Sequence, residues 1–222
     1  MNFLSHYYFD RQCANCYHIL GTVLPDLLKN ADKTIVLHPE KLRHHTPAVN
    51  AIIEGWQKHL DVDRHFHSSD FFVAHSRGLK EQLRPVIEGS PVKPFFLGHI
   101  AIELILDNLL ITTHKIRVDD FYDYLEQCQE DVVREFLTFS GMPDPNIFLN
   151  FFESFKKNRY LETYIDTAQV AYALKRICMR IWQQPFSAGQ EDAITRVIMD
   201  YRLLVYDSFM EIFDEIEEKL SS

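Results

Sequence analysis

The sequence predicts an all-α fold, in a single domain of about eight or nine helices. The chain has 222 residues, of which 46% are hydrophobic and only 7 are glycine. This composition is typical of a globular protein with few of the tight turns that an all-β fold requires. Apolar residues recur at spacings of three and four along most of the chain, which indicates amphipathic helices. The length favours one domain over two, and no repeat or low-complexity linker divides the sequence.

Helix starts and stops can be assigned from the N-terminus onward. Asn15 is expected to cap a helix that runs to about Asn30, and Pro25 is expected to kink or split that helix. The polar segment 31–46 reads as a loop, and Pro47 after Thr46 opens the next helix. Further helices are expected over 47–67, from 70 to about 88, from 94, from 119 or 120 to about 140, from about 146, over about 161–182, and for about thirty residues after 187.

Charge and composition exclude several classes of function. Asp and Glu outnumber Lys and Arg by 32 to 23, a net charge of −9, which argues against electrostatic binding of nucleic acid. We expect no membrane span, because ionisable residues interrupt the longest apolar run. The N-terminal segment lacks the pattern of a signal peptide, and four cysteines without secretion indicate reduced thiols. The expected location is therefore the cytoplasm.

A first candidate site follows from His59, Asp63 and His67, which are spaced four residues apart. On an α-helix these positions stack on one face, whereas Asp61 and His65 lie on another. The column could hold a metal ion. Alternatively, His59 pairs with Asp63 at the surface and His67 acts only at the helix end.

A second column has the same spacing and consists of His99, Glu103 and Asp107. It lies within the strongly apolar segment KPFFLGHIAIELILDNLLI, which predicts a helix buried nearly all round. Buried ionisable groups need partners, because removing them from water is costly. The column is therefore expected to face metal or a water-filled cavity, or else an internal hydrogen-bond network that ties helices together.

Two N-terminal residues are candidates for the same site. His6 lies in NFLSHYY, and Asp26 follows proline among leucines. A surface histidine and a capping aspartate are the simpler interpretations. The mixture of imidazole and carboxylate suits a hard or borderline divalent ion, such as Mn²⁺ or Fe²⁺. The Cys13–Cys16 pair has no second pair at zinc-finger spacing and is interpreted as incidental.

Four motifs resemble the acyl carrier protein phosphodiesterase family, whose members are similar to HD-domain metallophosphohydrolases. They are MNFLSHYYF, LGTVLPDLLKN, GWQKHLDVDRHFHSS and LILDNLL. They cover residues 1–115, while 116–222 share only helical content. The resemblance implies cleavage of the phosphodiester between 4′-phosphopantetheine and a serine of acyl carrier protein, with Mn²⁺ as the preferred metal. The residues that match its motifs are His6, Asp26, His59, Asp63 and Asp107.

The chain departs from the family pattern beside these residues. Thr22 stands where the family has asparagine, Leu60 where it has arginine, and Asn108 where it has histidine. Acyl carrier proteins are strongly acidic, and such partners are generally recruited by a basic patch. With a net charge of −9, the chain is expected to hydrolyse ordinary acyl carrier protein weakly, even if the metal site is real.

Three functional interpretations follow. In the first, the protein is a metal-dependent phosphohydrolase, with Asp63 and Asp107 as catalytic carboxylates and a phosphoester as substrate. In the second, it is a helical protein that binds metal or another ligand without hydrolysis. In the third, the polar columns only tie the core together. Metal ligands are expected among His6, Asp26, His59, Asp63, His67, His99, Glu103 and Asp107.

Overall fold

The computed structural model describes residues 1–221 and is all-helical over that range, which confirms the predicted fold class. These residues form eleven α-helices and two short 3-10 helices, more than the eight or nine helices expected. In chain order they are α1 (Phe3–Tyr8), α2 (Cys16–Ala31), η1 (Pro39–Lys41), α3 (Pro47–Ser68), α4 (Asp70–Val86), α5 (Pro94–Thr112), α6 (Val118–Glu126), α7 (Glu130–Phe139), α8 (Pro145–Asn158), η2 (Tyr160–Ile165), α9 (Thr167–Met179), α10 (Ala188–Val205) and α11 (Met210–Leu220).

Capping residues and prolines set most helix starts, as the sequence predicted. The Asn15 side chain accepts hydrogen bonds from two backbone N–H groups of the first turn of α2, and Ser69 caps α4 in the same way. Pro47 and Pro94 are the first residues of α3 and α5, where a missing N–H costs nothing. Ser187 starts α10 through a capping box.

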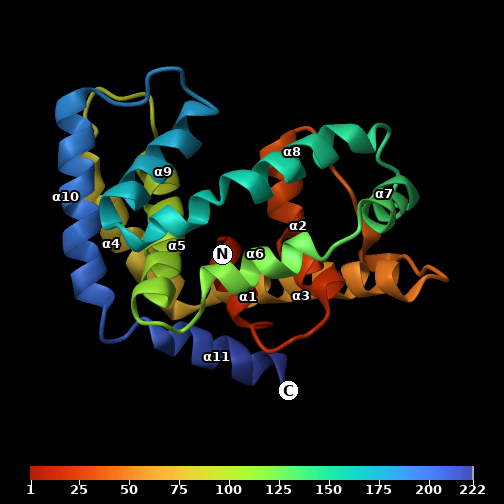
Figure 1. The fold of residues 1–222 in the computed structure, drawn as a ribbon. Coiled ribbons are helices and arrows are strands. Elements are labelled where there is room, and N and C mark those ends of the chain that lie inside the picture. The colour runs from red at the N-terminus through yellow and green to blue at the C-terminus, as the bar shows by residue number, and fades with distance from the viewer. Residues whose placement is uncertain (222) are drawn as a thin grey trace. The chain divides into compact units, whose positions relative to one another are not determined.

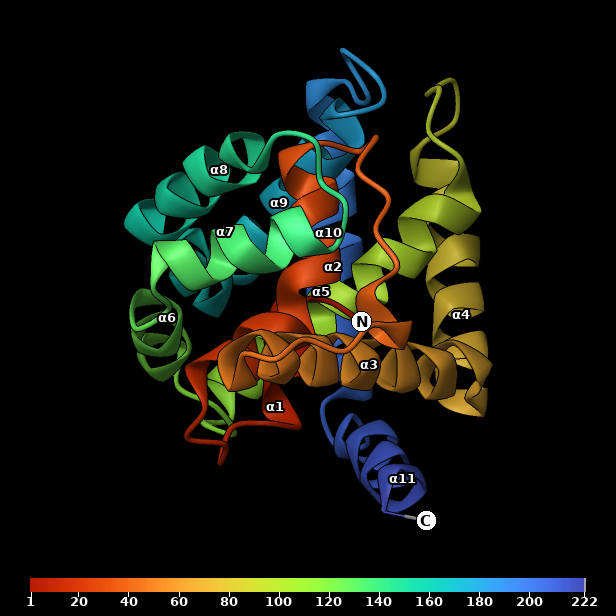
Figure 2. The same cartoon turned by 90° about the vertical axis from the view of Figure 1, so that its right-hand side faces the viewer.

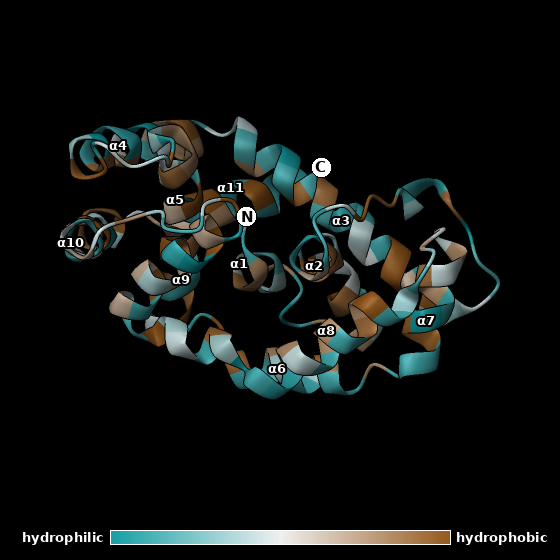
Figure 3. Cartoon of the chain, turned by 90° about the horizontal axis from the view of Figure 1, so that it is seen from above, coloured by the Kyte–Doolittle hydropathy of each residue, from teal (hydrophilic) through white to brown (hydrophobic). Residues whose placement is uncertain are grey.

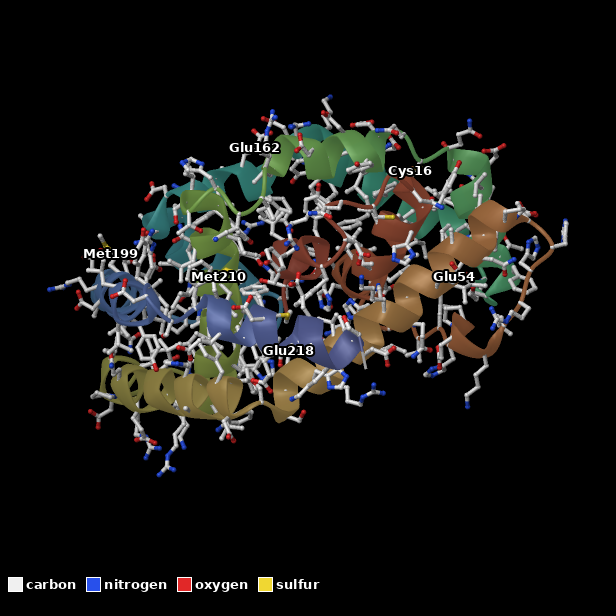
Figure 4. The ribbon with its side chains drawn as sticks, turned by 90° about the horizontal axis from the view of Figure 1, so that it is seen from below. Cys16, Glu54, Glu162, Met199, Met210 and Glu218 are labelled. Atoms are coloured by element: carbon white, nitrogen blue, oxygen red, sulfur yellow. The ribbon has the colours of Figure 1, made fainter. Side chains whose placement is uncertain are left out.

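Pro25 does not split α2, which continues to Ala31, close to the expected end. Three other expected boundaries were wrong. The helix expected over about 120–140 is two helices, because Gln129 adopts an extended conformation and starts α7. The helix expected from about Leu161 starts at Thr167, capped by Asp166. The long C-terminal helix also divides: α10 ends at Val205, and α11 begins at Met210, labelled in Figure 4.

The chain forms two compact units, each discontinuous in sequence. Residues 1, 64–115 and 163–222 make up one, called here the α5 unit, and residues 2–63 and 116–162 make up the other, the α2 unit. The boundary between Asp63 and Arg64 falls inside α3. The single-domain organisation expected from the sequence stays a prediction.

In the α5 unit, α5 packs against α4, α9 and α10 (Figure 1). Gly98 lets α4 and α5 approach closely, because a Cβ at this position would lie 2.6 Å from the carbonyl oxygen of Ser76. Residues from Ala101 to Ile111 are all buried. Close contact on several sides explains why this helix is apolar nearly all round.

Helix α5 is also long and apolar enough to cross a membrane when judged by length and composition alone, so the expected absence of a membrane span stays a prediction. However, 72% of its apolar window is buried inside the protein. Packing against α4, α9 and α10 therefore accounts for its composition. The more typical pattern appears in α8, where hydrophobic and hydrophilic residues alternate along the helix (Figure 3).

In the α2 unit, α2 contacts α1, α6 and α8 (Figure 2). Two glycines set its crossing with α3. A Cβ at Gly21 would lie 2.3 Å from the carbonyl oxygen of Ile52, and one at Gly55 would lie 2.1 Å from that of His18. Only glycine permits this distance between the two backbones, which brings the carbonyls of α2 within reach of side chains on α3.

Candidate metal centres

The first cluster joins His6 of α1 to His59 and Asp63 of α3, all within the α2 unit, and we call it the buried triad. His6 Nε2 lies 3.3 Å from Asp63 Oδ1. His59 Nε2 lies 3.5 Å from Asp63 Oδ2. The two imidazole rings stack with centroids 3.9 Å apart. The side chains of His6 and His59 are 0% and 4% exposed, and that of Asp63 is 29% exposed.

These separations suit a shared metal ion. Ligand atoms bonded to a metal at about 2.1 Å, with angles of about 90° to 110°, lie about 3.0 to 3.4 Å from one another. The nitrogen–oxygen distances of 3.3 and 3.5 Å are close to this range. One ligand atom from each residue lies within 4.8 Å of the other two. The triad therefore needs little movement to close around an ion.

The orientation of His59 leaves its Nε2 atom available to coordinate a metal ion. Its Nδ1 lies 2.9 Å from the carbonyl oxygen of Thr22. A carbonyl can only accept, so Nδ1 carries a proton, and in the neutral ring the lone pair is on Nε2, which faces Asp63. Metal-binding histidines are typically held through the second ring nitrogen in this way. The close crossing at Gly21 and Gly55 is what brings Thr22 near His59.

His6 is the least satisfied polar side chain of the triad. Both of its ring nitrogens are buried, and neither makes a hydrogen bond within residues 1–221. Burial, with a smaller contribution from the adjacent His59, lowers the pKa of His6 to about 3. The ring is therefore neutral at physiological pH and offers a lone pair. A buried polar atom without a partner is unusual in native proteins and suggests a missing ion or water.

Asp63 supplies the negative charge of the triad. Burial opposes its ionisation, but the His6 ring 3.3 Å away and, to a smaller extent, the neighbouring His59 outweigh burial and hold the pKa of this carboxyl well below its usual range. One carboxylate and two imidazoles form a ligand set typical of divalent transition metals.

The second cluster lies in the α5 unit and consists of His67, His99 and Glu103, called here the open triad. His99 Nε2 lies 3.0 Å from Glu103 Oε1, and His67 Nε2 lies 3.5 Å from the same oxygen. The two imidazole side chains are 36% and 41% exposed, whereas that of Glu103 is 11% exposed. Both imidazoles are thus far more accessible than those of the buried triad.

Glu103 is ionised despite its position in an apolar helix. Burial acts to raise its pKa, but the α-amino group of Met1, 3.5 Å away, and the two imidazoles hold that pKa well below its usual range. Both imidazole rings make T-shaped contacts with the Phe72 ring, at centroid distances of 5.0 and 4.9 Å. These contacts restrict how either imidazole can turn.

The structure therefore divides the two columns expected from the sequence. His59 and Asp63 do lie side by side, as do His99 and Glu103, but His67 joins the second pair instead of the first. His6 joins the first pair, as expected. Two expected ligands, Asp26 and Asp107, belong to none of the ligand groups found in residues 1–221. Asp26 is half-buried on α2 and Asp107 is fully buried on α5.

Asn108, where the family pattern has histidine, is buried and connects three elements of the α5 unit. Its Nδ2 donates to the carbonyl oxygen of Tyr164 at 2.6 Å, and Arg202 of α10 donates to its Oδ1. Arg202 also donates to Thr112 Oγ1 at 2.9 Å. These hydrogen bonds explain the asparagine at this position as a structural residue of the α5 unit. It belongs to neither triad.

Sequence reasoning missed a third group, which consists of His44, His45 and Glu135. The adjacent histidines are visible in the sequence, but Glu135 is 91 residues further along than His44. His44 Nδ1 accepts the backbone N–H of Thr46 at 3.1 Å, so its Nε2 carries a proton and faces Glu135 Oε1 at 3.6 Å. This arrangement suits a contact between the 32–46 loop and α7 better than a metal ligand.

Comparisons of the chain with protein-family models, with curated proteins and with solved structures find no match. The resemblance to the acyl carrier protein phosphodiesterases therefore stays a prediction that rests on the motifs in the sequence. The chemistry of the two triads has to be judged from their geometry.

Proposed function

We propose that this protein is a divalent-metal-dependent phosphohydrolase whose ion is held by the buried triad. One observation carries the proposal: the buried neutral His6 has no hydrogen-bond partner within residues 1–221, although it faces an ionised Asp63. An ion between them would satisfy the imidazole and offset the carboxylate charge. His59 is already oriented for coordination by the carbonyl of Thr22.

When bound, such an ion polarises a phosphoryl oxygen and lowers the pKa of a coordinated water. The residues of this chain position and tune that chemistry. Asp63 offers both carboxylate oxygens, one toward each imidazole. It is also the most exposed member of the triad, so a substrate phosphate would approach on its side. The near-complete burial of His6 and His59 excludes water from the opposite side.

The family resemblance points to the same residues. His6, His59 and Asp63 all stand at positions that match its motifs, and the resemblance suggests Mn²⁺ and a phosphodiester substrate. Acyl carrier protein is one candidate substrate, but the acidic character of this chain disfavours its docking. A small phosphodiester is therefore the better first substrate to test.

The test is hydrolysis of a small chromogenic phosphodiester by the full chain with Mn²⁺ present. Asp63→Asn should lower turnover by at least about 100-fold, because it removes the anionic ligand at nearly constant volume. Asp61→Asn is the matched control, because Asp61 lies on the same helix and belongs to neither triad. It should retain wild-type turnover. Equal losses in both variants, or no turnover in the wild type, would contradict the proposal.

A second candidate function is metal binding without hydrolysis. The observation that favours it is the low exposure of the buried triad, where only Asp63 is reached by solvent to an appreciable extent. Protein purified without chelator would then contain a stoichiometric metal that depends on Asp63 but would turn over no phosphoester. Elemental analysis combined with the turnover assay separates the two functions.

A further inference from the structure

We propose that the open triad is a second divalent transition-metal site, which loads independently of the buried triad and keeps coordination positions open to an exogenous oxyanion such as phosphate. Its ligands are His67, His99 and Glu103. None of the three belongs to the positions that match the family motifs, and the function proposed above uses none of them. The inference therefore stands on these residues alone.

The donor set defines the class of metal. Two imidazole nitrogens and one carboxylate oxygen are the ligands of many zinc hydrolases and of non-haem Fe(II) sites. The nitrogen–oxygen distances of 3.0 and 3.5 Å bracket the separation of about 3.0 to 3.4 Å expected between neighbouring ligands. The three ligand atoms also lie within 4.8 Å of one another.

A hydrogen-bond network around Glu103 is the competing explanation, and it accounts for only one of the two imidazoles. His99 Nε2 makes a hydrogen bond to Glu103 Oε1 at 3.0 Å. His67 Nε2 is buried and makes no hydrogen bond within residues 1–221, although the same oxygen is 3.5 Å away. A metal ion would use the lone pair of His67 that the network leaves unsatisfied.

The exposure of the ligands indicates an incomplete coordination shell. Three protein ligands leave at least one position of a four-coordinate ion to solvent or substrate. Both imidazole side chains are more than a third exposed, although Nε2 of His67 is itself buried, so the triad lies near enough to the surface for a small oxyanion to approach it. The buried triad has no comparably exposed imidazole.

The elements that carry the ligands are held in place before any ion binds. Helix α3 ends at Ser68, the residue after His67, and Ser69 caps α4. Phe72 in the first turn of α4 contacts both imidazoles. The glycine contact at Gly98, next to His99, fixes the approach of α4 to α5. A preorganised site costs little conformational entropy when it binds metal.

The experiment titrates metal-free full-length protein with Co²⁺ and follows its visible absorption. The wild type should bind two equivalents, and Asp63→Asn should bind one. His99→Gln and Glu103→Gln should each bind one, and His65→Gln, on α3 but outside both triads, should bind two. Circular dichroism on each variant checks that it is folded. Phosphate added to cobalt-loaded Asp63→Asn, in which only the open triad remains, should shift the absorption bands.

Several results would overturn the inference. Two equivalents in folded His99→Gln or Glu103→Gln would show that the open triad holds no ion. A complete loss of cobalt in folded Asp63→Asn would show that the two triads do not load independently. An unchanged spectrum on adding phosphate would show that the ion has no open position. Failure of the proposed hydrolase is separable, because it would appear as loss of turnover with cobalt stoichiometry intact.

Discussion

The buried His6 should make the stability of the metal-free protein depend on pH in a defined window. In the native state the pKa of His6 is about 3, lowered by burial and by the neighbouring His59, whereas the unfolded chain has the ordinary histidine value of about 6.5. Below pH 6.5 the unfolded state therefore binds a proton that the native state does not bind. Stability is fully retained above pH 6.5 and falls as the pH drops toward 3.

The size of the effect follows from the two pKa values. Each pH unit in this window costs about 1.4 kcal/mol, so His6 alone should lower the free energy of unfolding by roughly 3 kcal/mol between pH 8 and pH 4.5. Asp63 contributes in a different range. Its pKa is depressed in the native state, so its stabilisation is present above about pH 4 and is lost below it.

The measurement is urea denaturation of chelator-treated protein at pH 8 and at pH 4.5. His6→Phe keeps an aromatic ring against His59 but cannot titrate, so its loss of stability between the two pH values should be smaller than that of the wild type by roughly 3 kcal/mol. Subtracting the loss of stability in the variant from that in the wild type removes contributions that both proteins share. One of these comes from His75, whose pKa is also lowered by burial. Equal losses in both proteins would refute a buried neutral His6.

Three further outcomes are expected. Mn²⁺ at a hundred times its dissociation constant should stabilise metal-free protein by about 2.7 kcal/mol and raise its melting temperature, and no shift at millimolar Mn²⁺ would contradict a metal site. Gly21→Ala should destabilise the protein by about 2 kcal/mol or more, because the new Cβ would lie 2.3 Å from the Ile52 carbonyl oxygen. It should also weaken metal binding by displacing Thr22. Gly189→Ala is the control: its Cβ would meet no atom within 4 Å, so the change should be neutral or slightly stabilising. Release of phosphopantetheine from holo acyl carrier protein should be weak beside hydrolysis of a small chromogenic phosphodiester, and efficient release would contradict the charge argument.

The sequence by itself determined the fold class, most helix starts and the pairs within each column. These features depend on local chemistry: Asn15, Ser69 and Ser187 cap helices through their own side chains, and residues four apart on a helix are neighbours wherever that helix lies. This is why His59 was correctly paired with Asp63. The breaks at 127–129 and 206–209 were missed because the flanking residues keep helical periodicity, and buried residues on each side decide where the chain turns.

Only the tertiary structure decided which pairs acquired a third ligand. His6 reaches Asp63 across 57 residues of sequence, and His67 reaches Glu103 across 36; neither contact has a local signature. The glycine crossing of α2 and α3 is equally non-local, because each of Gly21 and Gly55 requires the other backbone to make the close approach. Spacing along one helix specifies a face, whereas a coordination shell needs ligands from at least two elements. The packing of those elements is therefore what separates eight candidate ligands into two triads and leaves Asp26 and Asp107 outside both.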